Sequence, residues 1–322
     1  MNNLKSIFVK RTISSIFALI TCLILIFSLS GCDAAKSPAP GITNIGVIFS
    51  SGGLGDKSFN DSAYKGLLDA QKQFNIRFET VTYSGTETDL TALRSFEQNK
   101  YDLIIGIGFD NTKNVQTVAQ EFPAVKFAEI DAELMGDNIE SIVYREQEGD
   151  FLTGALAAML TKTKKVGVIG GTDIPSIRRI MAGFTQGVAY QDSSVTVVTD
   201  FAGTFSDPNV GFNLAIARYN EGVDVIHNAA SKTGLGIIQA AQQLNKLTTG
   251  TSGDQRYLAP GNMIGNRPKR VDTAVQMVIE EVHNGTFKAG VRSLGLKENG
   301  LALGPFDENV VTPAILSRIE EL

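Results

Sequence analysis

The residues of this 322-residue chain that are best suited to chemistry are two carboxylates and a glycine-rich stretch. Glu129 and Asp131 are two residues apart at the end of an apolar run, a spacing that could serve acid–base work. We instead expect one of them to point into a binding cleft and to accept a hydrogen bond from a hydroxyl group. The stretch from Ser50 to Asp56 contains three glycines, which let a loop approach a ligand closely, and Asp61 after it could cap a helix.

The motifs of common catalytic sites are missing from the sequence. The glycine-rich stretch does not match G-x-G-x-x-G, and the chain contains neither G-x-x-x-x-G-K-[ST] nor a G-x-S-x-G elbow. His227 and His283 are the only histidines, and neither has an obvious nucleophile partner in the sequence, so a zinc site would need additional carboxylates. After Gly170-Gly171, we interpret Asp173 or Ser176 as a plain helix cap. We therefore expect no catalytic residue, no metal and no cofactor.

Apolar β-branched runs alternate with helical patterns, and these elements must position the residues above. Strands are expected at 45–49, 77–83, 103–107 and 125–130, and helices at 61–74, 88–97 and 112–121. Short strands separated by helices of about ten residues indicate right-handed βαβ units and a parallel sheet that is covered on both faces.

The same alternation then starts again. Strands are expected at 165–170, 195–200 and 223–226, and helices at 176–190, 209–219 and 233–244. Two α/β sets predict two similar lobes that face each other across a cleft, with ligands bound beyond the carboxyl ends of the strands.

The chain must cross between the lobes more than once. The segment 141–147 is expected to be the first crossing, and the helix 270–283 and the tail 294–304 supply further ones. We predict one lobe from residues 42–142 with about 256–290, and the other from 143–255 with about 291–322.

The N-terminus looks like a bacterial lipoprotein leader. Three basic residues precede an apolar stretch at 12–29, which ends in Leu29-Ser30-Gly31-Cys32. A transmembrane anchor is the alternative, because the stretch is just long enough to span a bilayer, but a cysteine directly after Leu-Ser-Gly favours lipidation. We expect a signal peptide at 1–31, acylation of Cys32, for example with palmitate, and a tether at 32–41. The protein would then be anchored to the cell membrane on its extracytoplasmic side.

Charge and cysteine content narrow the classes of partner. Outside the leader the chain has 26 basic against 34 acidic residues, a formal charge of −8, which argues against nucleic acid. Cys22 falls in the leader and Cys32 is the acylation site, so no cysteine is left for a disulfide. We expect a monomer.

At Gly55-Asp56-Lys57-Ser58-Phe59-Asn60-Asp61 the chain resembles the basic membrane protein family, the purine-nucleoside-receptor-like substrate-binding lipoproteins of ABC importers. Further matches follow in order: the strand that ends in Asp131, the segment 170–187, Thr204-Phe205-Ser206-Asp207-Pro208, the segment 223–236, Asp254-Gln255, Pro260-Gly261 and Lys269-Arg270-Val271. The resemblance covers nearly the whole mature chain. It implies an α/β, type I periplasmic-binding-protein fold, in which two Rossmann-like lobes with parallel sheets are joined by a multi-strand hinge and hold a nucleoside.

The resemblance also implies roles for single residues. It assigns base stacking to Phe59 and the binding of ribose hydroxyls to Asp131 and Lys269, which fits an aromatic face and charged groups. Two other interpretations stay open: Phe59 could pack under its own loop, and Asp131 and Lys269 could form an interlobe salt bridge without a ligand role.

Three positions differ from the nucleoside pattern of the family. Ser50 stands where an acidic or amide residue reads the base edge, His227 stands where the second stacking aromatic lies, and Ser252 replaces an Asp. The expected ligand-binding set is Ser50, Asp56, Phe59, Asn60, Asp131, His227, Ser252 and Lys269.

The predicted function is that of a non-enzymatic receptor, which captures a small nucleoside-like ligand and delivers it to an ABC permease. A flavin or a modified nucleoside is an alternative cargo for the same fold, and a sensory lipoprotein is an alternative function. A nucleoside hydrolase is disfavoured, because the chain lacks the clustered aspartates that metal-assisted hydrolysis requires.

Overall fold

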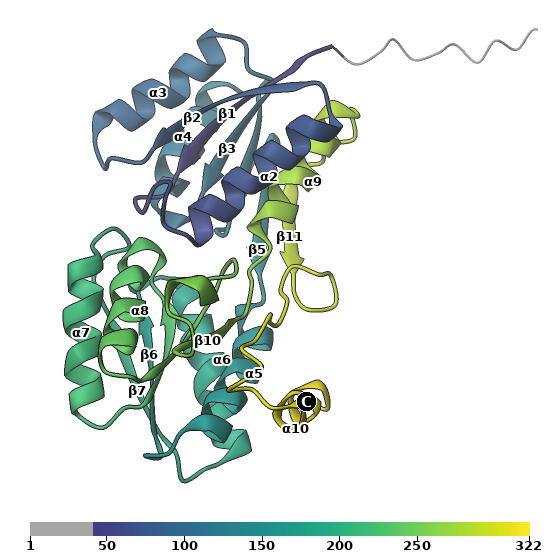
Figure 1. The fold of residues 1–322 in the computed structure, drawn as a ribbon. Coiled ribbons are helices and arrows are strands. Elements are labelled where there is room, and N and C mark those ends of the chain that lie inside the picture. Colours follow the sequence, from purple (N-terminus) through teal and green to yellow (C-terminus); the bar gives the residue numbers. More distant parts are fainter. Residues whose placement is uncertain (1–40) are drawn as a thin grey trace, which may run out of the picture. The chain divides into compact units, whose positions relative to one another are not determined.

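The computed structural model describes residues 41–322, which form two parallel β-sheets, each covered by helices on both faces (Figure 1). The expected signal peptide, Cys32 and all of the tether except Gly41 lie outside the described residues. Two parallel-sheet lobes are the α/β architecture that the alternating pattern predicts.

The first lobe is built on a six-stranded sheet. Its order is β11 (Gly290–Leu294), β5 (Ile139–Tyr144), β4 (Lys126–Ile130), β3 (Leu103–Ile107), β1 (Thr43–Phe49) and β2 (Ile76–Thr82). One face is covered by α2 (Phe59–Gln73) and α9 (Val271–His283), and the other by α3 (Glu87–Gln98) and α4 (Thr112–Glu121). Because both faces are covered, β1, β3 and β4 are buried almost throughout.

The second lobe is built on a five-stranded sheet. Its order is β10 (Met263–Asn266), β9 (Leu247–Gly250), β8 (Val225–Ala229), β6 (Lys165–Gly170) and β7 (Thr196–Phe201). One face is covered by α5 (Glu146–Leu160) and α6 (Pro175–Gln191), and the other by α7 (Pro208–Asn220) and α8 (Gly234–Gln243). The helix α10 (Pro313–Glu320) packs against the outer side of α5.

The sheets correct the predicted boundaries at the C-terminal side. Residues 263–266, expected in the first lobe, pair with β9 in the second, and 291–294, expected in the second lobe, pair with β5 in the first. The helix α5 was not predicted, because ten of its fifteen residues are buried and no polar stripe marks its period. Its first residue, Glu146, falls within the segment that we expected to be a crossing.

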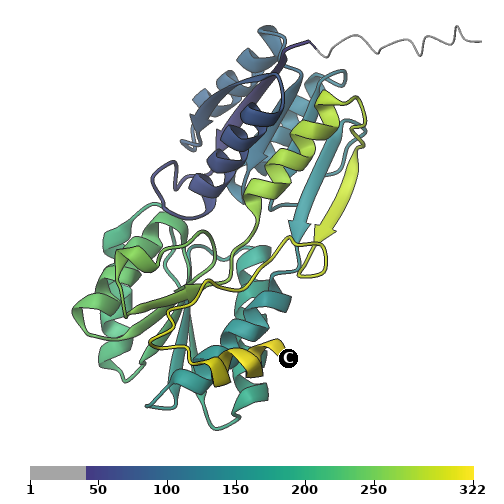
Figure 2. The ribbon, with the colours of Figure 1, turned by 45° about the vertical axis from the view of Figure 1, so that its right-hand side comes forward.

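Three segments cross between the lobes and lie side by side as a hinge. The first is at Arg145, whose N–H donates to Leu294 O at the start of the third crossing. The second runs from Arg267 to Arg270, and Lys269 pairs with Leu301 in an antiparallel bridge. Figure 2 shows β5 and β11 running together toward the second lobe and α9 lying beside α2. The multi-strand hinge of the expected fold is therefore present.

The helices α5 and α6, which cover one face of the second sheet, pack closely against each other. A Cβ atom on Gly187 of α6 would lie 1.8 Å from Phe151 O of α5, so these helix backbones touch directly. Only glycine allows such an approach, and it fixes the close spacing of α5 and α6 near the C-terminal end of α6.

Candidate ligand-binding site

A cavity lies between the two lobes, beyond the carboxyl ends of the strands of both sheets. The first lobe contributes the loops after β1, β3 and β4, and the second lobe contributes those after β6, β7, β8 and β9. This location is where doubly wound sheets bind ligands.

Five of the eight predicted residues line this cavity, namely Ser50, Phe59, Asp131, Ser252 and Lys269. Asp131 has φ +78° and Ser231, which also lines the cavity, has φ +50°. Non-glycine residues rarely adopt such values, and five others within residues 41–322 lie outside the cavity. The structure thus brings five predicted residues to one place, and one of them, Asp131, has an unusual backbone conformation.

Asp56 and Asn60 lie behind the cavity wall and shape the loop. Asp56 is fully buried and accepts hydrogen bonds from the N–H groups of Ser58 (2.8 Å), Asn60 (2.9 Å) and Asp61 (3.1 Å). It therefore caps α2, whereas the expected cap, Asp61, accepts from Gly55 and Lys57 in the loop. Neither Asp56 nor Asn60 is among the residues that line the cavity, so the structure gives both a positioning role.

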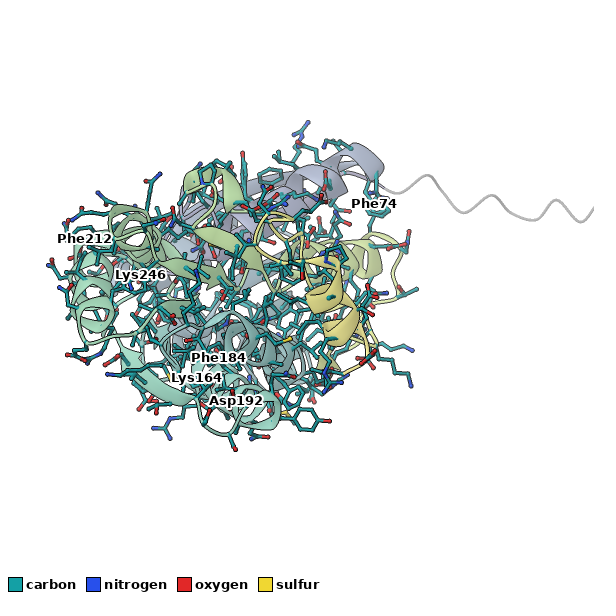
Figure 3. All side chains as sticks on the ribbon, turned by 60° about the horizontal axis from the view of Figure 1, so that its bottom comes forward. Phe74, Lys164, Phe184, Asp192, Phe212 and Lys246 are labelled. Atoms are coloured by element: carbon teal, nitrogen blue, oxygen red, sulfur yellow. The ribbon has the colours of Figure 1, made fainter. Side chains whose placement is uncertain are left out.

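His227 is placed away from the cavity, contrary to its expected place as the second stacking group. The side chain is fully buried in the second lobe, with Nε2 2.9 Å from Asp150 Oδ1 and Nδ1 2.7 Å from Thr249 Oγ1. Its ring stacks on that of Phe184, which Figure 3 labels inside this lobe, with centroids 5.3 Å apart. The arrangement resembles a hydroxyl–His–Asp triad, but its burial closes it to any substrate.

Aromatic side chains line the cavity from both lobes. Phe59 comes from the first lobe and Phe205, in the loop after β7, comes from the second. Phe109, which is 42% exposed, lies at the same cavity. Phe205 was not singled out as a site residue, although it stands inside one of the motifs that carried the resemblance.

Lys269 joins the two lobes at the floor of the cavity. Its Nζ lies 2.5 Å from Asp131 Oδ1 in the first lobe and 2.9 Å from Glu146 Oε1 in the second. Arg179 Nε lies 2.5 Å from the other oxygen of Glu146. The Nζ is also 5.9 Å from the centre of the Phe59 ring and 5.2 Å from that of Tyr144. Of this network, Lys269 and Asp131 line the cavity.

The two carboxylates that bind Lys269 have different electrostatics. Burial raises the pKa of Asp131 to about 6, although the Lys269 charge works to lower it. Burial also acts to raise the pKa of Glu146, but Lys269 and Arg179 together hold it below its ordinary value. Asp131 is thus the carboxylate of this network that changes charge most readily near neutral pH.

Glu129 differs from Asp131, two residues away. It is fully buried beneath α4, and both carboxylate oxygens lack a hydrogen-bond partner within residues 41–322. Burial raises its pKa well above the ordinary value, and the charges of Asp131 and Asp110 add to the shift. The expectation that one of the paired carboxylates points into the cleft is met by Asp131 alone, since Glu129 does not line the cavity.

Two smaller expectations about helix caps are wrong. Asp173 pairs with Arg178 at 2.5 Å, and α6 begins at Pro175 with Ile174 as its N-cap residue and no side-chain cap. Ser176 instead lines the cavity. The part of the chain that the structure describes contains no group of three or more His, Cys, Asp or Glu residues suited to a metal. Within the same residues, no helix has the length and apolarity needed to cross a bilayer.

Two parallel α/β lobes around a cavity, joined by three crossings, define the class of type I solute-binding proteins. A solute-binding protein of an ABC transporter system from Aeropyrum pernix K1 is similar, with a TM-score of 0.78 and 31% identity over 87% of this chain and 81% of that one. A periplasmic solute-binding protein from Actinobacillus succinogenes 130z, solved with bound D-allose, has a TM-score of 0.65 and 15% identity over 81% and 96%. This second likeness is one of fold alone.

The family follows from the sequence comparison. The model of the family described as ABC transporter substrate-binding protein PnrA-like (Bmp) matches residues 42–319, so the chain belongs to this family. Basic membrane protein A of Borreliella burgdorferi is 31% identical over 85% of this chain and 82% of that protein. An uncharacterized lipoprotein of Pyrococcus abyssi is 32% identical over 91% and 76%. The resemblance on which the sequence argument rested is confirmed.

Proposed function

We propose that this substrate-binding protein captures a nucleoside-like ligand, a flat heterocycle with a hydroxyl-rich group, and delivers it without catalysis to an ABC permease. The observation that carries the proposal is the division of the cavity. Phe59 and Phe205 offer aromatic faces from opposite lobes, and Lys269 with Asp131 offers charged partners for hydroxyls at the hinge. A ligand that uses both ends must touch both lobes, and its binding would favour the closed arrangement.

The polar partners in the cavity support a neutral, hydroxyl-bearing group over a phosphate at the hinge end. Lys269 is already shared by Asp131 and Glu146, and Arg179 is engaged by Glu146. A dianion would compete with two fixed carboxylates, whereas a vicinal diol can donate to a carboxylate and accept from the ammonium group.

Native mass spectrometry of freshly purified protein tests the identity of the ligand directly. A bound mass equal to that of a nucleoside supports the proposal, and a flavin mass with its visible absorbance contradicts it. Titration calorimetry with a panel of ribonucleosides then gives affinities, and the failure of every member to bind would also contradict the proposal.

Removal of the aromatic faces tests the mode of binding. We expect Phe59→Ala and Phe205→Ala each to weaken nucleoside binding by about 1–3 kcal/mol, the scale of base–aromatic stacking. Phe201→Ala is the matched control, because Phe201 lies in the second lobe, as Phe205 does, but is exposed and outside the cavity. A large loss of stability with unchanged affinity in Phe59→Ala would instead favour packing under its loop.

We further propose that Cys32 is the lipid anchor. Relatives in this family are named lipoproteins, and Leu29-Ser30-Gly31-Cys32 has the expected form. Expression of Cys32→Ser in a bacterial host, followed by membrane fractionation, should move the protein into the soluble fraction. An unchanged membrane fraction would contradict the anchor.

A further inference from the structure

We propose that Asp110 determines ligand specificity by accepting a hydrogen bond from an N–H group of the bound heterocycle. The inference rests on the proposed function and names the chemistry that the cavity selects. Nothing in the family resemblance assigned a role to this position, which lies in the turn after β3.

The position of Asp110 follows from how tightly its turn packs against Phe59. Gly108 has φ +89°, and a Cβ atom there would lie 3.2 Å from Phe59 Cε1 and 3.1 Å from Ser50 Cβ. The turn that begins at Gly108 therefore rests against the edge of the Phe59 ring. Asp110, two residues further on, lines the same cavity. A heterocycle stacked on Phe59 would present its edge to this carboxylate.

The hydrogen bonds of Asp110 leave one of its oxygens for a ligand. Ser51 donates to Oδ2 through both its N–H (3.1 Å) and its hydroxyl group (2.6 Å). These two bonds orient the side chain. Within residues 41–322, both hydrogen bonds of the Asp110 carboxylate go to Oδ2, and Oδ1 receives none. A carboxylate can only accept, so the complementary ligand group must be a donor.

Asp110 can replace a function that the end of β1 has lost. Ser50 stands where the family resemblance implies the residue that reads the base edge, but both its N–H (3.1 Å) and its hydroxyl group (3.0 Å) donate to Asn60 Oδ1. β1 and β3 are adjacent parallel strands, so their carboxyl ends lie side by side. A carboxylate at the end of β3 thus faces the same part of the cavity as one at the end of β1.

The chemical class of ligand follows from this geometry. A base with an amino group or a ring N–H opposite Oδ1 gains a charge-assisted hydrogen bond. A base with only ring acceptors at that edge leaves the carboxylate without a partner in a partly desolvated site. We expect that difference to be about tenfold or more in affinity. The cavity therefore selects amino- or imino-bearing heterocycles.

Calorimetry with three nucleosides tests the inference. Adenosine and guanosine carry N–H donors on the base, and purine riboside has the same ring system and sugar without them. The wild type is expected to bind the better of the first two at least about tenfold more tightly than purine riboside. Asp110→Asn can keep the bonds from Ser51 through its amide oxygen and turns an NH₂ group toward the ligand, so it should abolish this preference.

Asp102→Asn is the matched control. Asp102 Oδ2 accepts the N–H of Asn44 at 2.8 Å, at the amino end of the same strand and outside the cavity. It should leave the preference unchanged, and thermal melts check that both variants fold. If the wild type binds purine riboside as tightly as the better of adenosine and guanosine, or if the preference survives in Asp110→Asn, the role of Asp110 is overturned while the nucleoside function stands. Binding of none of the three would overturn both.

Discussion

Arg267 and Lys269 are two residues apart on the second crossing, yet they bury their charges in opposite ways. Arg267 is fully buried and reaches both oxygens of Asp150, from Nε at 3.0 Å and Nη2 at 2.7 Å, and His227 approaches the same carboxylate. These partners all belong to the second lobe. Lys269 instead has one carboxylate partner in each lobe, Asp131 and Glu146.

The difference separates a permanent anchor from a contact that depends on closure. The Arg267 cluster stays intact however the lobes are arranged, so it fixes the crossing segment to α5. The Lys269 bridge exists only when the lobes are together, so a ligand that binds there acts on the closed arrangement. In this short segment, Arg267 thus stabilises the second lobe, and Lys269 is placed to bind a ligand.

Removal of Arg267 should produce the largest effect. Arg267→Ala leaves Asp150 as a buried charge without its guanidinium partner, and we expect the free energy of unfolding to fall by about 3–5 kcal/mol. Urea unfolding followed by circular dichroism measures the change, and Asp150→Asn, which keeps the shape but removes the charge, serves if Arg267→Ala does not fold.

The control for this prediction is an exposed ion pair in the same lobe. Arg178 and Asp173 have side chains that are 71% and 46% exposed, so Arg178→Ala should cost at most about 1 kcal/mol. Equal stabilities of the two variants would show that the buried cluster is no anchor.

Lys269 should show the opposite balance of stability and affinity. Lys269→Met is expected to weaken the binding of the best nucleoside by about 1.5–3 kcal/mol, the range for hydrogen bonds to charged groups. Its effect on unfolding should be smaller than that of Arg267→Ala, because Glu146 keeps Arg179 as a partner. Calorimetry and urea unfolding on the same preparations compare the two.

A double-mutant cycle sharpens this prediction. Asp131→Ala should also reduce affinity, and the double variant should lose less than the sum, because both residues bind one ligand group and each other. Unchanged affinity in all three variants would leave the Lys269–Asp131 pair as a plain interlobe salt bridge.

The sequence predicted the scaffold far better than the boundaries and the buried polar network. β3 and α4 begin and end where their patterns indicated, because a run of five apolar residues and a strong 3.6-residue period are local signals. β9 and β10 have only four residues each, and their place in the second sheet depends on pairing partners distant in the chain. Such pairing has no local signature.

His227 shows why part of the site could not be predicted. Strand residues alternate between faces, and His227 shares its face with Val225, toward α5 and α6. The motif at 223–236 does not show which face of the sheet His227 occupies. Its partner Asp150 lies on α5, a helix that the sequence pattern did not indicate. Phe59, by contrast, begins α2 directly after the loop that follows β1. The carboxyl end of β1 fixes where this loop begins, so the place of Phe59 at the cavity was predictable.

The stability of the folded protein should depend on pH through Asp131, the first-lobe partner of Lys269. The pKa of Asp131 is raised from 3.8 to about 6 in the folded protein, so its contribution to stability is full below the unfolded value and is lost as the pH rises through the folded one. We expect the stability of the wild type relative to Asp131→Asn to decline over this window.

Lys269→Met should move this decline to higher pH, because the lysine charge lowers the pKa of Asp131. Urea midpoints measured across the window test both statements. Parallel stability curves for the wild type and Asp131→Asn would contradict them.

The smallest expected effect concerns a contact that closes the lobes at another point. Ser231 in the second lobe donates its hydroxyl hydrogen to Asp56 Oδ2 in the first, at 2.8 Å. Like the Lys269 bridge, this bond exists only in the closed arrangement, but Asp56 keeps its other donors when the bond is lost. Ser231→Ala should therefore speed ligand release by an amount equivalent to about 0.5–1.5 kcal/mol and leave unfolding nearly unchanged.

The matched control is Ser194→Ala, which removes a hydroxyl–carboxylate bond of 2.6 Å to Asp192 within the second lobe. Because that bond does not join the lobes, the control should leave the release rate unaltered. Stopped-flow fluorescence with a displacing ligand measures the rate, and solution scattering measures the compaction on binding. If Ser231→Ala and Ser194→Ala release ligand at the same rate, the Ser231–Asp56 bond does not couple closure to binding, and the contrast between Lys269 and Arg267 stands without it.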